Sequence, residues 1–393
     1  MQNVLHIPDV VRDLKGEAAY AVLARAEELE REGKNIVHME IGQPDFKTPA
    51  PVVEAARLSL TRGDHGYAPT LGIRELREAI ATRESKKRGI EVNWRNVAIM
   101  PGGKTAIFIA MAATLEAGDE VLYPDPGFPT YRNVSDYLRC IPKALPIVES
   151  RDFSFDREAF TRLVSPKTRM IILNSPSNPT GGVIPKDDLH FVAASAIKNN
   201  SWILSDEIYD ELSFDEDRVA STWDIPEVRE QTIVLNSFSK TFAMAGWRLG
   251  YMIVPGSLIS IVDALSVNLF ACTATFTQHA GIAAASLYDE VAHMRSQYLE
   301  RRNYLVSALH SIEGVSCRMP KGAFYVFPNV SSFGRSSQEI AEKLLVDFGV
   351  AVLPGTAFGA YGEGYLRLSY ATSMEHIREG VKRIGKGLDS LRT

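Results

Sequence analysis

Short apolar runs rich in valine and isoleucine alternate with longer segments of helical period along the middle of the chain. This alternation is typical of βαβ units and predicts a largely parallel sheet flanked by helices. Helices are predicted between the strands, for example at 104–117 and 186–199. The strands are predicted at 96–100, 120–125, 143–148, 169–174, 201–206 and 232–237.

One more apolar run, "LGYMIVP" at 249–255, follows the strand at 232–237 after only a short connection. A parallel crossover needs a dozen or more residues, so this strand is predicted to run antiparallel to its neighbours. The resulting fold class is α/β, with a mostly parallel seven-stranded sheet that contains one antiparallel strand.

The pattern changes after about residue 280. A long charged segment of helical period covers 283–312, and alternating strands at 322–330 and 364–371 surround another helix. The chain start carries a helix at 18–33 and a short strand, and by itself could join either body. We therefore predict a large domain at 45–280 and a smaller α+β domain built from 1–44 and 281–393.

Composition narrows the class of protein. Hydrophobic residues make up 45% of the 393 residues and charged residues 23%, as in folded proteins. The net charge of −5 is modest and argues against electrostatic binding to nucleic acid or an anionic membrane. Disorder is excluded as the main state.

The cysteines and the chain start bear on location. Cys140, Cys272 and Cys317 are widely separated, which signals neither a disulfide framework nor a zinc site, and no other metal is expected. A reducing cytoplasm fits this usage.

Charged residues interrupt the apolar positions near the start, and no run approaches the ~20 apolar residues of a membrane span. We expect a protein that is neither exported nor anchored.

Polar loops follow four of the predicted strands, at the edge where ligands bind to open parallel sheets. Each loop alone is more typical of a turn, a helix cap or a solvated lysine. Together they supply a phosphate cradle, an amide, a carboxylate near a phenol, and a lysine among serines. This set matches pyridoxal phosphate, which has a phosphate, a pyridine nitrogen, a ring oxygen and an aldehyde. The loops are "PGGK" (101–104), "NSPSNPTGG" (174–182), "SDEIY" (205–209) and "SFSK" (237–240).

With these motifs, the sequence resembles the class I aminotransferases, which are fold type I pyridoxal-phosphate enzymes of the aspartate aminotransferase kind. The resemblance covers nearly the whole chain. It rests on "IGQPDF" (41–46), "HGYAPTLGIRELREAI" (65–80), "NPTGG" (178–182), "SFSKTFAMAGWRLG" (237–250) and "YLRLSYA" (365–371).

The resemblance implies roles for individual residues. Lys240 would carry the cofactor and later move the substrate α-proton, and Asp206 would pair with the pyridine nitrogen. Asn178 and Tyr209 would reach the ring oxygen, and Phe128 would stack on the ring. The phosphate would be held by the backbone N–H groups of Gly103 and Lys104, the hydroxyls of Ser237 and Ser239, and the guanidinium of Arg248.

Further roles concern the substrate and a second subunit. Arg367 would grip the substrate α-carboxylate, helped by Asn178 and the backbone at Gly42. Tyr67 would extend to the phosphate of a neighbouring subunit, which implies a homodimer. From the residues alone, Arg367 could equally lie on the solvent face of an antiparallel strand, Phe128 in ordinary core, and Tyr67 in loop packing.

The pairing of Lys240 with Arg248 has a physical reason. A free lysine has a pKa of ~10.4 and is almost entirely charged at neutral pH, so desolvation and nearby cations must favour its neutral form. A phosphate dianion in a partly buried pocket needs a fixed countercharge, which a planar guanidinium supplies to two oxygens at once.

These roles predict ping-pong transfer of an amino group between an L-amino acid and a 2-oxo acid. Carbon–sulfur β-elimination on the same scaffold remains an alternative. Nucleotide binding at Gly103-Lys104-Thr105 is another, although the P-loop pattern would need glycine where Ala98 stands. No second cation for a dicarboxylate is assigned, and Tyr20, Asn268 and Cys272 are candidates for the substrate pocket.

Overall fold

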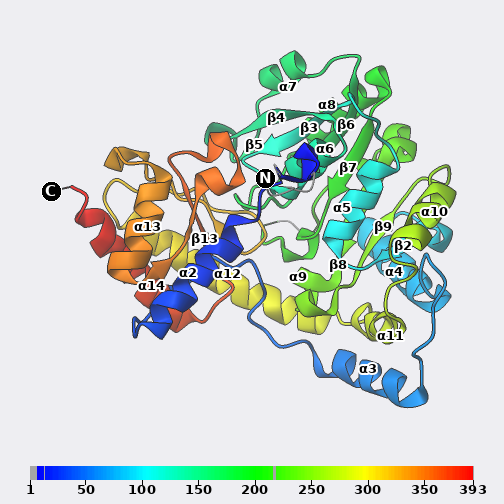
Figure 1. The fold of residues 1–393 in the computed structure, drawn as a ribbon, viewed down its shortest axis with the longest axis horizontal. Helices are drawn as coiled ribbons and strands as arrows, with labels where there is room; N and C mark the ends of the chain where they lie inside the picture. Colours follow the sequence, from blue (N-terminus) through cyan, green and yellow to red (C-terminus); the bar gives the residue numbers. More distant parts are fainter. Residues whose placement is uncertain (1–6, 13, 216–217, 393) are drawn as a thin grey trace, which may run out of the picture.

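The largest sheet of the computed structural model has eight strands in the order β2-β9-β8-β7-β6-β3-β4-β5 (Figure 1). The structure describes residues 7–12, 14–215 and 218–392, so a few residues of both predicted domains lie outside it. The strands are β2 (Val97–Met100), β3 (Glu120–Asp125), β4 (Ile141–Val148), β5 (Ser154–Phe155), β6 (Thr168–Asn174), β7 (Trp202–Asp206), β8 (Thr232–Ser237) and β9 (Gly250–Ile253).

Strand directions confirm the predicted α/β class. Strands β4, β3, β6, β7 and β8 pair in parallel, and β9 runs antiparallel to both β2 and β8, as its short connection predicts.

The predicted count of seven strands with one reversed is corrected by β5, which pairs antiparallel with β4. This strand has only two residues, too few to show a period. It returns to the sheet because Asp152 and Phe153 take left-handed backbone conformations, with φ of 52° and 60°.

Helices cover both faces of this sheet, because successive side chains of each buried strand point to opposite faces. Met170 and Ile172 pack into one core cluster, and Ile171 and Leu173 pack into another. The first face carries α5 (Gly103–Ala112), α6 (Thr130–Tyr137) and α10 (Ile259–Leu269). The opposite face carries α4 (Arg74–Arg88), α7 (Arg157–Leu163), α8 (Lys186–Asn199) and α11 (Thr275–Ala284).

Two smaller sheets lie beside the large one. β1 (Val37–His38) pairs in parallel with β11 (Val350–Ala351), and β13 (Leu366–Ser369) lies between β10 (Tyr325–Val326) and β12 (Leu353–Pro354). Figure 1 shows α2, in blue, near the orange and red C-terminal helices, and Ala26 and Leu29 share a core cluster with Leu345. The two ends of the chain therefore pack together. The helices here are α2 (Ala18–Arg31), α12 (Asp289–His310), α13 (Ser337–Phe348) and α14 (Met374–Asp389).

Three further helices complete the set: α1 (Asp9–Arg12), α3 (Ala50–Arg62) and α9 (Phe238–Thr241). Helix α3 lies at the lower edge of Figure 1, packed beside α11. Among the helices of the described chain, none is long and apolar enough to cross a membrane.

Candidate active site

A cavity of about 520 Å³ lies at the carboxyl ends of the parallel strands, where β13 approaches the large sheet. The structure brings most of the predicted site residues together around it. They are Gly42, Gly103, Lys104, Phe128, Asn178, Asp206, Tyr209, Ser239, Lys240, Arg248 and Arg367.

Two predicted site residues lie elsewhere. Ser237 is buried next to the cavity, where its Oγ donates to Ser239 Oγ at 2.9 Å. Tyr67 exposes 93% of its surface and lines a separate hollow together with Cys272. Of the three candidates for the substrate pocket, only Tyr20 lines the cavity of the single chain. Asn268 lies exposed on α10 and Cys272 lines the hollow of Tyr67, so neither lies at the cavity of the single chain.

Lys240 lies on α9, the single helical turn that follows β8. Ser237 caps this turn by accepting a hydrogen bond from Ser239 N at 3.1 Å, and Lys240 Nζ donates to the carbonyl oxygen of Gly42. Burial, together with the nearby guanidinium of Arg367, lowers the pKa of Lys240 to about 8. The neutral amine is thus available near neutral pH, as the sequence argument requires.

Asp206 is the last residue of β7 and is only 3% exposed. Its carboxylate accepts hydrogen bonds from Tyr131 Oη at 2.7 Å and from the Ile208 backbone N–H at 3.2 Å. The pKa of Asp206 is raised to about 6, chiefly by burial, because both hydrogen bonds and the carboxylate of Glu207, which lower and raise it respectively, have smaller effects. A cation beside the carboxylate would reverse the shift.

A cationic pocket forms where α5 begins. Arg248 has a left-handed backbone, with φ of 54°, and its Nη1 donates to Ala245 O at 2.8 Å. No carboxylate in the described part of the chain forms an ion pair with it. Gly102 also has a positive φ of 93°, and a Cβ there would lie 2.2 Å from Arg248 Nη2. Glycine thus lets the guanidinium approach the helix N-terminus, where free N–H groups attract anions.

Arg367 is a buried cation at 3% exposure on β13. Its Nη1 donates to Asn178 Oδ1 at 3.3 Å, its Nη2 donates to the Glu40 carbonyl, and its Nε has no hydrogen-bond partner in the described part of the chain. The guanidinium carbon lies 4.5 Å from the ring centroid of Tyr325 and 5.0 Å from that of Phe358. Within the described residues it forms no ion pair. The solvent-face alternative is therefore wrong, and a buried unpaired cation favours an anionic ligand.

Several cavity residues were missed by the sequence argument. Tyr131 holds Asp206, and the Tyr325 hydroxyl lies 2.8 Å from that of Tyr209. Glu17 lines the cavity and forms an ion pair with Lys104. Tyr131 ends the stretch "PDPGFPTY" (124–131), which also contains Phe128, and could have been noticed there. The contacts of Tyr325 and Glu17 join distant parts of the sequence and leave no local signal.

The raised pKa of Asp206 predicts a pH-dependent stability effect in the ligand-free protein. Well below pH 4 the carboxyl is protonated in both the folded and the unfolded state, and well above pH 6 it is ionised in both. The ionised form costs folding free energy only in the native state, so the cost appears as pH rises. Asp206→Asn should raise the free energy of unfolding at pH 8 by about 3 kcal/mol, with little gain near pH 4. Urea unfolding at both pH values measures this, with exposed Asp347→Asn as the control; equal gains at both values would refute it.

Comparison with known proteins places the chain in a family. Residues 34–384 match the model of the family "Aminotransferase class I and II". The chain is 40% identical to aspartate aminotransferase of Pyrococcus horikoshii, covering 91% of each sequence. It is 38% identical to aromatic-amino-acid aminotransferase 2 of Thermococcus litoralis, covering 90% of this chain and 92% of the other. The structure of aspartate aminotransferase from Thermus thermophilus with maleate superposes with a TM-score of 0.93 at 34% identity, covering 98% of this chain and 100% of the other.

The family match extends over both the large sheet and the C-terminal strands that form the cavity. It leaves the nucleotide-binding alternative for "PGGK" without support, since Lys104 of that loop faces the same cavity as Lys240. The chain belongs to the class I and II aminotransferases and is a pyridoxal-phosphate-dependent aminotransferase of the class I kind.

Proposed function

We propose that the protein moves an amino group between an L-amino acid and a 2-oxo acid by a ping-pong reaction, using pyridoxal phosphate linked to Lys240. One observation carries this proposal. A single cavity joins a lysine of lowered pKa, a buried carboxylate and two arginines that have no carboxylate partner among the described residues. These groups match the amine, acid and anion sites that the cofactor and an amino acid require.

The residues around the cavity fit the cofactor. Asp206 would pair with the pyridine nitrogen, Phe128 would lie against the ring, and Asn178 and Tyr209 would reach the ring oxygen. When bound, the cofactor supplies an electron sink that acidifies the α-proton of the substrate. The phosphate would be held by Arg248, by the hydroxyls of Ser237 and Ser239, and by the N–H groups of Gly103 and Lys104.

The chain supplies orientation and proton transfer. The Arg367 guanidinium, aided by Asn178 and the Gly42 backbone, would bind the substrate α-carboxylate through two parallel hydrogen bonds. Tyr325 and Phe358 pack against that guanidinium, so water is kept from one side of the pair. The Nζ of Lys240, neutral above pH 8, would accept the α-proton of the substrate. It would then donate this proton to the carbon of the cofactor that bears the amino group.

Loss of Lys240 tests the proposal directly. In Lys240→Ala the amine that moves the proton is absent, so the rate of the half-reaction should fall by about 10³-fold or more while the fold is kept. The change of cofactor absorbance after mixing with an amino donor measures the rate, and circular dichroism measures the fold. Lys382→Ala, on the exposed side of α14, is the matched control. A Lys240→Ala variant with the wild-type rate would contradict the assignment.

The cavity also contains a candidate reader of the substrate side chain. Glu17 forms an ion pair with Lys104, and Lys104 Nζ lies 5.8 Å from the ring centroids of both Tyr20 and Phe128. A second substrate carboxylate at Lys104 would have to displace Glu17 and would meet its charge. We infer a preference for donors without a second carboxylate, such as aromatic amino acids, over aspartate.

Removing the charge of Glu17 should change this preference. In Glu17→Gln, Lys104 loses its partner and becomes free to bind a distal carboxylate. The ratio of kcat/KM for aspartate to that for phenylalanine should rise by about tenfold, equivalent to ~1.4 kcal/mol. Steady-state kinetics with both donors measure this ratio, and Glu28→Gln on the exposed part of α2 is the control. An unchanged or lower ratio would exclude Glu17 as a selector.

We further propose a homodimer in which Tyr67 reaches the phosphate site of the partner subunit. Tyr67 is almost fully exposed, and the neighbouring helix α3 exposes Val53, Leu58 and Leu60. Exposed apolar side chains at this density are typical of an interface.

The dimer can be tested at α3. Sedimentation should give twice the chain mass for the wild type, and Leu60→Glu should shift it toward monomer with loss of activity, because a charge is costly inside an apolar interface. An active wild-type monomer would contradict the shared site.

The domain division and the location also remain proposals. All strands of the large sheet fall within the proposed large domain at 45–280. The pairing of β1 with β11 favours the assignment of 1–44 and 281–393 to one smaller domain. A cytoplasmic location agrees with three cysteines that are all free thiols.

A further inference from the structure

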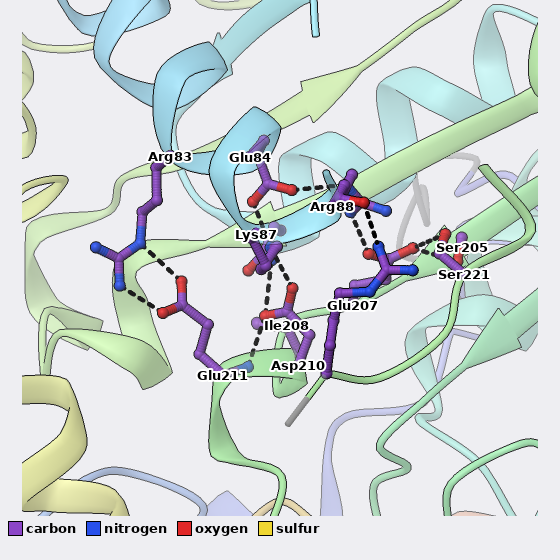
Figure 2. Close-up of polar contacts among 12 residues, drawn as sticks. Arg83, Glu84, Lys87, Arg88, Ser205, Glu207, Ile208, Asp210, Glu211 and Ser221 are labelled. Atoms are coloured by element: carbon purple, nitrogen blue, oxygen red, sulfur yellow. Dashed lines mark hydrogen bonds and ion pairs between the residues drawn. The ribbon is translucent and has the colours of Figure 1, made fainter. Parts of the chain in front are cut away.

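A buried network of charged side chains joins helix α4 to residues 205–211, the segment that carries Asp206 and Tyr209 out of β7. Figure 2 shows three cations of α4 directed at carboxylates of this segment, with the carboxylate of Glu84 between two of these cations. Asp206 and Tyr209 face the cavity, whereas these carboxylates face α4. The network comprises Arg83, Glu84, Lys87 and Arg88 of α4 and Glu207, Asp210 and Glu211 of the segment.

Glu207, the residue next to Asp206, is held by three donors. Its Oε2 accepts from Arg88 Nη2 at 2.5 Å, and its Oε1 accepts from Ser205 Oγ at 2.8 Å and from Ser221 Oγ. Glu207 and Arg88 are 5% and 6% exposed. The peptide that joins Asp206 to Glu207 is therefore fixed on the side away from the cavity as well as by Tyr131 on the cavity side.

The remainder of the segment is fixed in the same manner. Asp210 Oδ2 accepts from Lys87 Nζ at 2.5 Å, and Glu211 Oε1 accepts from Arg83 Nε at 2.8 Å. Tyr209 lies between the residues bound by Arg88 and Lys87. The cations at positions 83, 87 and 88 fall on one face of α4, which thus binds successive carboxylates of the segment.

Glu84 connects the cations to the strand that follows Arg248. Its Oε1 accepts from Lys87 Nζ at 2.5 Å and from Tyr251 Oη at 2.6 Å, and its Oε2 accepts from Arg88 Nε at 2.9 Å. Burial opposes ionisation of Glu84, but Lys87 and Arg88 hold its pKa at about 2. The carboxylate stays charged at working pH and orients both cations.

A buried ion network is weak evidence for added stability, because desolvation offsets most of the attraction. Removing one partner has a large effect, since it leaves a charge without compensation. Arg88 also pairs with Glu84 and with Asp224, which keep Lys87 and Arg218 as partners. Without Arg88, the carboxylate left without a cation among the described residues would be that of Glu207, one residue from Asp206. Loss of Arg88 would therefore place an uncompensated charge next to the carboxylate that the proposed function assigns to the cofactor.

We propose that Arg88 is a positioning residue for the transamination: acting through Glu207, it holds Asp206 and Tyr209 in the orientation that the bound cofactor needs. Arg88 touches neither cofactor nor substrate in this arrangement. The inference rests on the proposed function, because it takes Asp206 and Tyr209 as cofactor ligands.

The test compares two arginines of the same helix. Arg88→Gln and Arg83→Gln each break a buried ion pair, but Glu211, the partner of Arg83, lies five residues from Asp206. Both variants should lower Tm. Only Arg88→Gln should weaken binding of pyridoxal phosphate to cofactor-free protein, by about tenfold, and lower kcat with little change in KM for the amino donor, because the Arg367 site is untouched. Arg83→Gln should keep the Kd within about twofold of wild type.

A double-mutant cycle identifies the route of the effect. If Arg88 acts through Glu207, then Arg88→Gln and Glu207→Gln should combine to no more than the larger single effect on the Kd. Equal Kd values for wild type and Arg88→Gln would overturn the proposal, because the network would then contribute to the fold but not to cofactor binding. Additive effects in the cycle would overturn it too.

A milder variant covers the case in which Arg88→Gln does not fold. Ser205→Ala removes one hydrogen bond to Glu207 and keeps every ion pair, so the Kd should rise by about two- to threefold. A folded Ser205→Ala protein with wild-type Kd and kcat would overturn the proposal. Wild-type protein that does not bind pyridoxal phosphate would refute the proposed function instead, so the two failures are distinguishable.

Discussion

The cavity depends on the burial of Asp206 and Lys240 at the ends of adjacent strands, away from water. Burial moves the pKa of the acid up to about 6 and that of the amine down to about 8. Either group in water would titrate far from neutral pH. The surrounding features hold these two side chains in place: the Tyr131 hydroxyl on Asp206, the capped turn that carries Lys240, and the Arg367 guanidinium beyond it.

Such a site costs folding free energy in the ligand-free protein. Arg367 is buried, and its Nε has no partner among the described residues. Asp206 is ionised above pH 6 although burial disfavours its charged form. The large sheet, apolar on both faces and covered by helices, offsets this cost. Anionic ligands for the cations and a cationic partner for Asp206 would remove it on binding, because each supplies the missing countercharge.

Strand geometry explains how one short segment serves two purposes. Successive side chains along an extended chain point to opposite sides. At the end of β7 the side chain of Asp206 therefore faces the cavity, and that of Glu207 faces α4. Ion pairs on the α4 side thereby fix the backbone that carries the cavity residue Asp206. The dense charges of "RESKKR" at 83–88 would ordinarily suggest a solvated helix end, whereas Arg83, Glu84 and Arg88 are buried.

The sequence by itself determined the elements and the residue types of the site. Strands at 120–125 and 232–237 and the helix at 186–199 have the predicted bounds, because their apolar period and flanking turns are local signals. The parallel sheet then places the loops that carry Asn178, Asp206 and Lys240 at one edge. Only the tertiary structure decided the two-residue strand β5, the approach of Arg367 to the cavity, and the contacts of Glu17 with Lys104 and of Arg88 with Glu207. These features join residues far apart in the chain, and their charges are bound or buried only after the cores have packed, so no local pattern records them.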